Sequence, residues 1–185
     1  MFTAQQKRKE NIAEYILYMW QIEDLIRAYS LNIEVIVDNI VSKTAYGDAE
    51  KLQLRDWYES LIEMMRTEGV QQQGHLQLVK NTLSDVVDLH YAMLKSPKFP
   101  EYSAMFYQTL PTIGSLRQRQ NNRDAEDIEI CFVFLYGVLM LRLQKKEISD
   151  DTKLAIMQIS RFLALLSQKY KLYLNNELEL EEPEV

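Results

Sequence analysis

The segment that most constrains the fold is residues 128–143, with the sequence IEICFVFLYGVLMLRL. It carries no charge between Glu129 and Arg142, and apolar residues occupy every side of a helical wheel. A helix of this kind lies either inside a protein core or inside a bilayer. Its charge-free run of 12 residues is shorter than the roughly 18 apolar residues that a membrane span needs. We therefore predict that a helix over residues 124–146 lies at the centre of a helical bundle, and we expect no membrane partner.

Length and composition indicate one globular domain. A chain of 185 residues with 47% hydrophobic and 26% charged residues has enough apolar surface for a single core. We predict a single helical domain over residues 1–175, followed by an acidic, flexible tail over residues 176–185. Without the five glutamates of that tail, 22 acidic residues face 21 basic ones. No basic surface for nucleic acid is therefore expected.

The chain contains one cysteine, Cys131, inside the apolar segment. A single cysteine excludes an internal disulfide and fits a reducing compartment. The first residues show no apolar signal core, so we expect a cytoplasmic protein. Apolar neighbours suppress the thiolate, and Cys131 is therefore interpreted as an inert core residue rather than a nucleophile.

Hydrophobic periodicity predicts an all-α, single-domain bundle of six to seven helices, the first of them over residues 6–29. Residues 30–41 fit either a strand or a short helix, and the helix is favoured because no other segment offers a strand partner. Pro111 is expected to close a short helix that starts at Pro100, which leaves residues 112–123 as a polar loop. Ser149 is expected to cap the last helix. Gly137 is predicted to be the point where a neighbouring helix approaches the central helix most closely.

Metal and cofactor chemistry find little support in the sequence. Carboxylate-bridged metal centres in bundles use Glu-x-x-His on facing helices, a motif that is missing here, and the chain has only His75 and His90. We therefore expect no metal, no cofactor and no catalytic residue. His90 interrupts an otherwise apolar helical stripe. It is either a ligand-binding or acid–base group inside the bundle, or, as we favour, a neutral histidine hydrogen-bonded in the core.

Three arginines precede the central helix: Arg117, Arg119 and Arg123. Arginines beside the N-terminus of a helix can hold an anion, because guanidinium and backbone N–H groups donate together. The alternative is a solvated loop in which these arginines pair with Asp124 and Glu126, and this is favoured because such surface pairs are common.

The opening segment, residues 7–29 with the sequence KRKENIAEYILYMWQIEDLIRAY, resembles the start of a family of uncharacterised bacterial proteins found mainly in Bacteroidetes. The length, the all-helical pattern and the scarcity of glycine and histidine extend this similarity over the chain. The resemblance implies a cytoplasmic helical protein. It implies no activity and no functional residues.

Two functions remain open from the sequence. The first is a non-enzymatic bundle that acts through protein–protein contact, as a homodimer, because several helices carry broad apolar stripes. The second is a protein that binds a small molecule or an anion, or acts on one as an enzyme, with a pocket near His90 or the 117–123 arginine loop.

Overall fold

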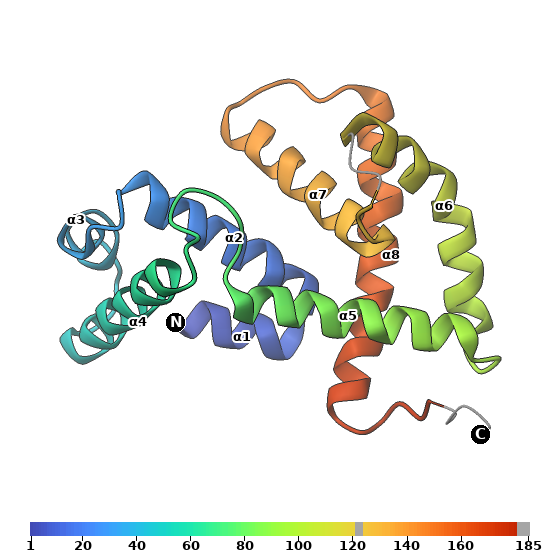
Figure 1. Cartoon of the computed structure of the whole chain (residues 1–185), viewed down its shortest axis with the longest axis horizontal. Helices are drawn as coiled ribbons and strands as arrows, with labels where there is room; N and C mark the ends of the chain where they lie inside the picture. Colours follow the sequence, from blue (N-terminus) through green and yellow to red (C-terminus); the bar gives the residue numbers. More distant parts are fainter. Residues whose placement is uncertain (121–123, 181–185) are drawn as a thin grey trace. The chain divides into compact units, whose positions relative to one another are not determined.

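The structure is a computed structural model that describes residues 1–120 and 124–180 (Figure 1). These residues form eight α-helices and one π-helical segment, and no strand occurs among them. The all-α prediction is confirmed. The elements are α1 (Phe2–Glu10), α2 (Ile12–Ala28), α3 (Ile33–Ile36), η1 (Val37–Val41), α4 (Asp48–Thr67), α5 (Gln77–Lys95), α6 (Pro100–Gln120), α7 (Asp127–Leu143) and α8 (Asp150–Leu174).

The chain divides into two compact units, and the boundary between them falls within α5. The first unit comprises Met1–Lys9 and Glu14–Thr82, and the second comprises Glu10–Ala13 and Leu83–Val185. The single domain over residues 1–175 stays a prediction.

The first unit contains α1, nearly all of α2, the α3–η1 segment and α4. α3 and η1 pack on α4. The core side chains of this unit come mainly from one stripe on α2 and one on α4, and they include Ile16, Met19, Ile26, Tyr58, Leu61 and Met65. The helical prediction for residues 30–41 is confirmed over residues 33–41, and the Asn32 side chain caps α3 by accepting from the N–H groups of Glu34 and Val35.

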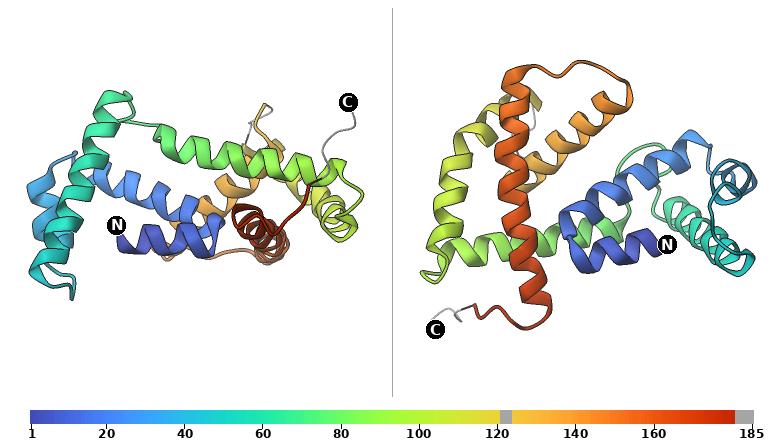
Figure 2. Two further views of the ribbon diagram at one scale, coloured as in Figure 1. Left: turned by 90° about the horizontal axis from the view of Figure 1, so that it is seen from below. Right: turned by 180° about the vertical axis from the view of Figure 1, so that it is seen from behind.

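In the second unit, α6, α7 and α8 pack on one another pairwise (Figure 2). α8 is capped by Ser149, whose hydroxyl accepts from the N–H of Thr152, as predicted. The fully buried large side chains of this unit include Met93, Tyr102, Ile113, Ile128, Phe132 and Phe162.

Two helix boundaries differ from the sequence prediction. The first helix was expected to be continuous over residues 6–29, but it breaks at Asn11. The Asn11 side chain accepts from the N–H of Ala13 at 3.1 Å, so it offers the backbone an alternative to the helical bond. This break contributes the helix beyond the six or seven expected.

The second difference is α6, which continues through Pro111 to Gln120. Proline removes one backbone donor and normally ends or kinks a helix. Here buried residues on both sides of the proline, among them Phe106 and Ile113, hold the helix against its neighbours, while Pro111 itself is exposed. Tertiary packing overrides the local signal, and the expected loop over residues 112–123 is helical as far as Gln120.

The apolar helix α7 is buried over only part of its length. Four of its first six residues, Ile128, Ile130, Cys131 and Phe132, are buried, but Val138 is the only buried residue in the rest of the helix. A Cβ atom built on Gly137 would meet no atom within 4 Å. The predicted close approach of a helix at Gly137 is therefore wrong, and the central placement of residues 124–146 holds for the beginning of α7 alone.

The acidic tail lies partly outside the described residues. Glu177–Leu180 form no helix, and Leu180 lines a cleft together with α5 and α8 residues of the same unit, such as Asp88 and Tyr173. The predicted flexibility of the tail stays a prediction.

Candidate functional site

His90 lies on α5 and is fully buried. Its Nδ1 atom is 2.5 Å from the hydroxyl oxygen of Tyr102, and its ring packs edge-on against the rings of Phe106 and Phe162. Burial lowers the pKa of His90 to about 4, although the carboxylates of Asp127 and Glu126 act in the opposite direction. His90 is therefore a neutral core residue at physiological pH, which is the interpretation that the sequence favoured.

A cleft beside Tyr102 is not lined by His90. It has a volume of about 250 Å³, and its lining includes Phe99, Tyr102 and Lys169. Burial raises the pKa of Tyr102, so its hydroxyl stays protonated. The Nε2 atom of His90 is buried and has no hydrogen-bond partner among the described residues. His90 does not line this cleft, and the ligand-binding role considered for His90 stays a prediction.

Arg117 connects α6 to the start of α7. Its Nη2 atom lies 2.5 Å from the Asp127 carboxylate, and its Nη1 atom donates to the carbonyl oxygen of Ala125. A partly buried guanidinium that is already bound to a carboxylate is not available for an anion. Arg117 is thus paired with a carboxylate, as the sequence favoured, but it lies on helix α6 and not in a solvated loop, and its described carboxylate partner is Asp127. Arg123 lies outside the described residues.

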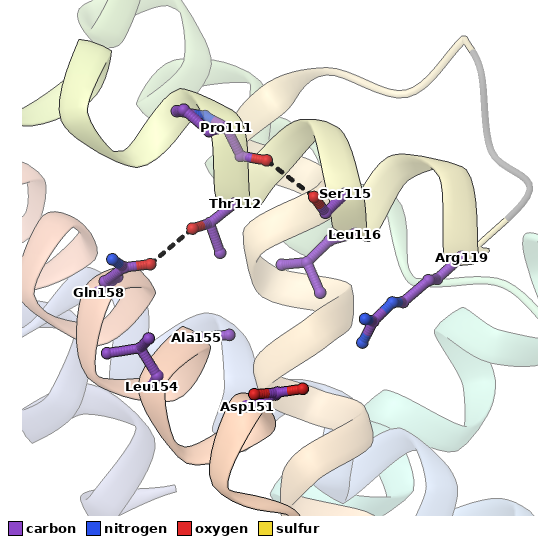
Figure 3. Close-up of a pocket in the computed structure, with 9 residues that line it drawn as sticks. All are labelled: Pro111, Thr112, Ser115, Leu116, Arg119, Asp151, Leu154, Ala155 and Gln158. Atoms are coloured by element: carbon purple, nitrogen blue, oxygen red, sulfur yellow. Dashed lines mark hydrogen bonds between the residues drawn. The ribbon is translucent and has the colours of Figure 1, made fainter.

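Arg119 lines a cleft. The cleft has a volume of about 310 Å³ and lies between α6 and α8 (Figure 3). Pro111, Thr112, Ser115, Leu116 and Arg119 line it from α6, and Asp151, Leu154, Ala155 and Gln158 line it from α8. The structure does not bring Arg117 and Arg119 to the same ligand position, and the anion site of the 117–123 arginine loop stays a prediction.

The polar groups of this cleft are divided between its two ends. At one end the Thr112 hydroxyl donates to Oε1 of Gln158 at 2.5 Å, which links α6 to α8. At the other end the guanidinium of Arg119 and the carboxylate of Asp151 are turned towards each other (Figure 3). The side chains of Leu116, Leu154 and Ala155 lie between the two ends. The cleft therefore presents a positive group, a negative group and an apolar wall.

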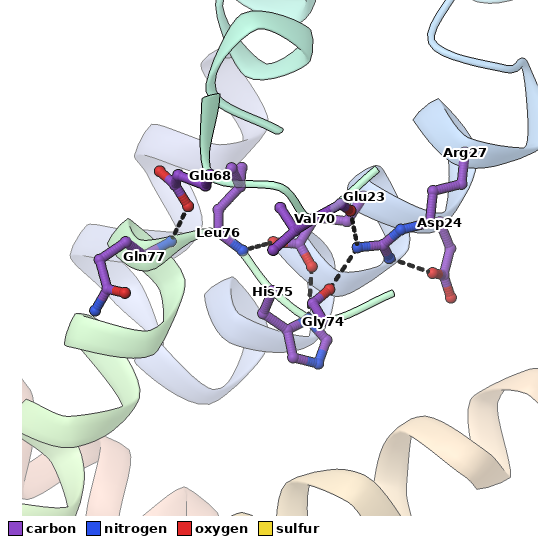
Figure 4. A network of polar contacts seen from close by, with 9 residues as sticks. All are labelled: Glu23, Asp24, Arg27, Glu68, Val70, Gly74, His75, Leu76 and Gln77. Atoms are coloured by element: carbon purple, nitrogen blue, oxygen red, sulfur yellow. Dashed lines mark hydrogen bonds and ion pairs between the residues drawn. The ribbon is translucent and has the colours of Figure 1, made fainter. Parts of the chain in front are cut away.

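A buried carboxylate in the first unit escaped the sequence analysis. Glu23 is fully buried on α2; its Oε2 atom is 2.6 Å from Nδ1 of His75, and its Oε1 atom accepts from the N–H of Leu76 at 2.9 Å (Figure 4). The His75 ring stacks on Trp20 with 4.4 Å between the ring centroids. Glu23 therefore holds the start of α5 against α2.

The four-residue spacing of Glu23 and Arg27 is typical of a surface ion pair on a helix, but Glu23 is buried. Arg27 instead pairs with Asp24 at 2.8 Å and donates to the carbonyl oxygens of Val70 and Gly74. One signal could have revealed Glu23: it stands four residues after Met19 and three before Ile26, both of which are on the apolar stripe. A glutamate at a core position needs hydrogen-bond partners.

The second half of α7 leaves an apolar face exposed. Val133 and Leu143 are exposed by 37% and 66%, and Gly137 is also exposed. Phe134, Leu135, Leu139, Met140 and Leu141 are only partly buried. The exposure of apolar side chains on a segment that carries no charge between Glu129 and Arg142 makes this half of α7 a candidate interaction surface.

The described residues define an all-α protein whose buried polar groups, Glu23 and His90, are held by hydrogen bonds within the core. Within those residues no helix is long and apolar enough to cross a membrane, and no group of three or more metal-ligating side chains occurs. The chain belongs to the family described as "Domain of unknown function (DUF4924)", which matches residues 1–177. The resemblance of residues 7–29 to a family of uncharacterised proteins is confirmed. No curated protein matches the chain, and no solved structure matches it.

Proposed function

We propose that the protein acts through protein–protein contact as a homodimer, in which the exposed faces of two α7 helices pack together. The observation that carries this proposal is the run of exposed and half-buried apolar residues from Val133 to Leu143. Covering such a face stabilises a complex by about 25 cal/mol for each Å² of apolar surface removed from water. We also expect a bacterial, cytoplasmic protein, in keeping with the single buried thiol of Cys131.

The charges at the two ends of α7 favour a second copy as the partner. The helix begins with Asp127 and Glu129 and ends with Arg142, followed by Lys145 and Lys146. A two-fold axis across the middle of α7 would pair the helices antiparallel, since a two-fold interface uses the same patch on both subunits. The acidic first turn of each α7 would then lie beside the basic last turn of the other copy. The dipoles of the two helices would be antiparallel, which is also favourable.

Sedimentation equilibrium of the full chain at micromolar to tens-of-micromolar concentration tests the proposal. We expect a dimer for the wild type and a monomer for Val133→Lys, because the new charge would be buried without a partner. Val133 is exposed within the chain, so the variant should keep the helical circular dichroism spectrum of the wild type. A monomeric wild type over the whole concentration range overturns the proposal.

Two further variants separate this face from a general effect of surface charge. Leu52→Lys changes an equally apolar residue that is 59% exposed on α4, and it should remain dimeric. Glu129→Lys should weaken the dimer, and adding Lys145→Glu should restore it, because the double change reverses the sign at both ends. If Leu52→Lys dissociates the dimer as strongly as Val133→Lys, the α7 interface is wrong.

A further inference from the structure

We propose that the cleft between α6 and α8 binds a small zwitterion with an apolar side chain, the chemistry of an apolar α-amino acid. Arg119 would hold the carboxylate of the ligand, and Asp151 its ammonium group. The apolar side chain would cover Leu154. This inference is independent of the α7 homodimer, since none of the residues that line the cleft belongs to α7.

Two opposite charges face the cleft without forming an ion pair with each other. Arg119 and Asp151 point towards each other across its open end (Figure 3), but no ion pair joins them or ties either to another side chain of the described residues. The neighbouring carboxylate of Asp150, by contrast, is paired with Lys153 at 2.7 Å. Each charge of the cleft is thus available to a ligand.

Helix dipoles explain part of this placement but not all of it. Arg119 lies in the last turn of α6, and Asp151 lies in the first turn of α8, where cations and anions respectively stabilise a helix by about 0.3–1 kcal/mol. That role would be served equally well by side chains that point into open solvent. The dipoles do not require the two charged groups to converge on the same cleft.

The two charges of the lining disfavour an anion, a cation or a neutral molecule as the ligand. An anion at Arg119 would be repelled by Asp151, and a cation at Asp151 would be repelled by Arg119. A neutral ligand would leave both charges without partners and partly desolvated. A zwitterion satisfies both charges, and arginine binds a carboxylate through two parallel hydrogen bonds.

The size of the cleft and its apolar wall fit a small ligand with an apolar side chain. A volume of about 310 Å³ lies at the lower end of the range for small-molecule sites, about 300–1,000 Å³. Leu154 is 53% exposed and stands beside Ala155 and Leu116 in the lining. At the far end, Gln158 and Thr112 already bond to each other. The apolar part of the ligand therefore has one place to lie, against Leu154.

Saturation-transfer-difference NMR on the full chain tests the proposal, with leucine, methionine and phenylalanine as probes. Each amino acid is compared with its N-acetyl derivative, which lacks the ammonium group, and with its amide, which lacks the carboxylate. At least one free amino acid should bind, and both of its derivatives should bind at least about tenfold more weakly, the equivalent of about 1.4 kcal/mol. Absence of binding by all three amino acids, or equal binding of the derivatives, overturns the proposal.

Matched variants locate the binding. Arg119→Gln and Asp151→Asn should each raise the Kd of the bound amino acid at least about tenfold. Arg161→Gln and Asp150→Asn change exposed charges on α8 that do not line the cleft, and they should leave the Kd unchanged. Asp150→Asn also matches Asp151→Asn in its effect on the helix dipole. If Asp150→Asn weakens binding as much as Asp151→Asn, the assigned role of Asp151 is wrong.

Discussion

The Glu23 carboxylate lies 2.6 Å from Nδ1 of His75, although 52 residues separate them in sequence. Glu23 is fully buried, whereas the His75 side chain is 36% exposed. A second oxygen of the same carboxylate accepts from the N–H of Leu76. One side chain of α2 therefore fixes both the side chain and the backbone at the entry to α5.

Glu23→Gln should lower the free energy of unfolding by about 1–3 kcal/mol. The amide lacks the negative charge of the carboxylate, so the charge-assisted hydrogen bonds to His75 and Leu76 become at best neutral bonds, which are about half as strong. Urea unfolding followed by circular dichroism measures the change.

Asp24→Asn is the matched control for Glu23→Gln. Asp24 is the next residue on α2, half-exposed, and it pairs with Arg27 at the surface. Exposed ion pairs contribute about 0–1 kcal/mol, so this variant should be nearly neutral. Equal destabilisation by the two variants would contradict a special role for the buried carboxylate.

His90 should make stability fall as the pH falls below about 6.5. Burial lowers the pKa of His90 in the folded protein to about 4, while in the unfolded chain it is about 6.5. Between these two values the unfolded state binds more protons, so stability rises with pH in this window and is unaffected by His90 above it. The loss from pH 6.5 to pH 4 should be roughly 3 kcal/mol from this group.

Urea unfolding at a series of pH values measures this dependence, with His90→Phe as the comparison. The variant cannot take up the proton, so its stability should fall less steeply between pH 6.5 and pH 4. A ring carbon–proton NMR titration gives a direct check, because the His90 resonance should show no protonation at pH 6. A midpoint near 6.5 would show that His90 is accessible to water in the folded state.

Pro111→Ala should raise the free energy of unfolding by about 1–3 kcal/mol. Proline in a helix interior costs about 3 kcal/mol relative to alanine, and α6 continues through this position. Alanine would restore the missing N–H donor. Pro100→Ala serves as the control, because Pro100 is the first residue of α6, where proline is well tolerated. Equal effects at the two sites would indicate that the helix does not run through Pro111.

Cys131 should react with a thiol reagent such as Ellman's reagent only when the protein unfolds. It is free and fully buried, and burial raises the pKa of its thiol well above the usual range. The thiolate is the reactive form, so labelling in native buffer should be slow and should accelerate along the urea unfolding curve. Rapid labelling of the native protein would show that the first half of α7 opens readily.

Most helices could be predicted from the sequence because their apolar residues recur at three- and four-residue spacing. The Ser149 cap followed from a local rule and is confirmed. The helix within residues 30–41 was favoured because no other segment offers a strand partner, and it is confirmed over residues 33–41. The break at Asn11 has a weak local signal, since asparagine caps helices but is also tolerated within them. The continuation of α6 through Pro111 has no local signal, because packing on both sides of the proline decides it.

The sequence predicts only part of the candidate site. The residue types of Arg117 and Arg119 mark a positive segment, but the sequence cannot show that Arg117 is bound by Asp127 while Arg119 lines a cleft with Asp151. That cleft joins two helices that are separated by the whole of α7. Its charge pair depends on which faces of α6 and α8 meet.

The sequence alone predicts an all-helical protein with Cys131 in its core, favours a core position for His90 over a ligand-binding one, and indicates that residues 128–143 need apolar surface around them. The tertiary structure shows how much of this segment the rest of the described residues bury. α7 is buried over its first turns and exposed at Val133, Gly137 and Leu143. The physical reason is that hydrophobicity is a property of each side chain and can be read locally, whereas the surface that buries it comes from distant parts of the chain or from another molecule.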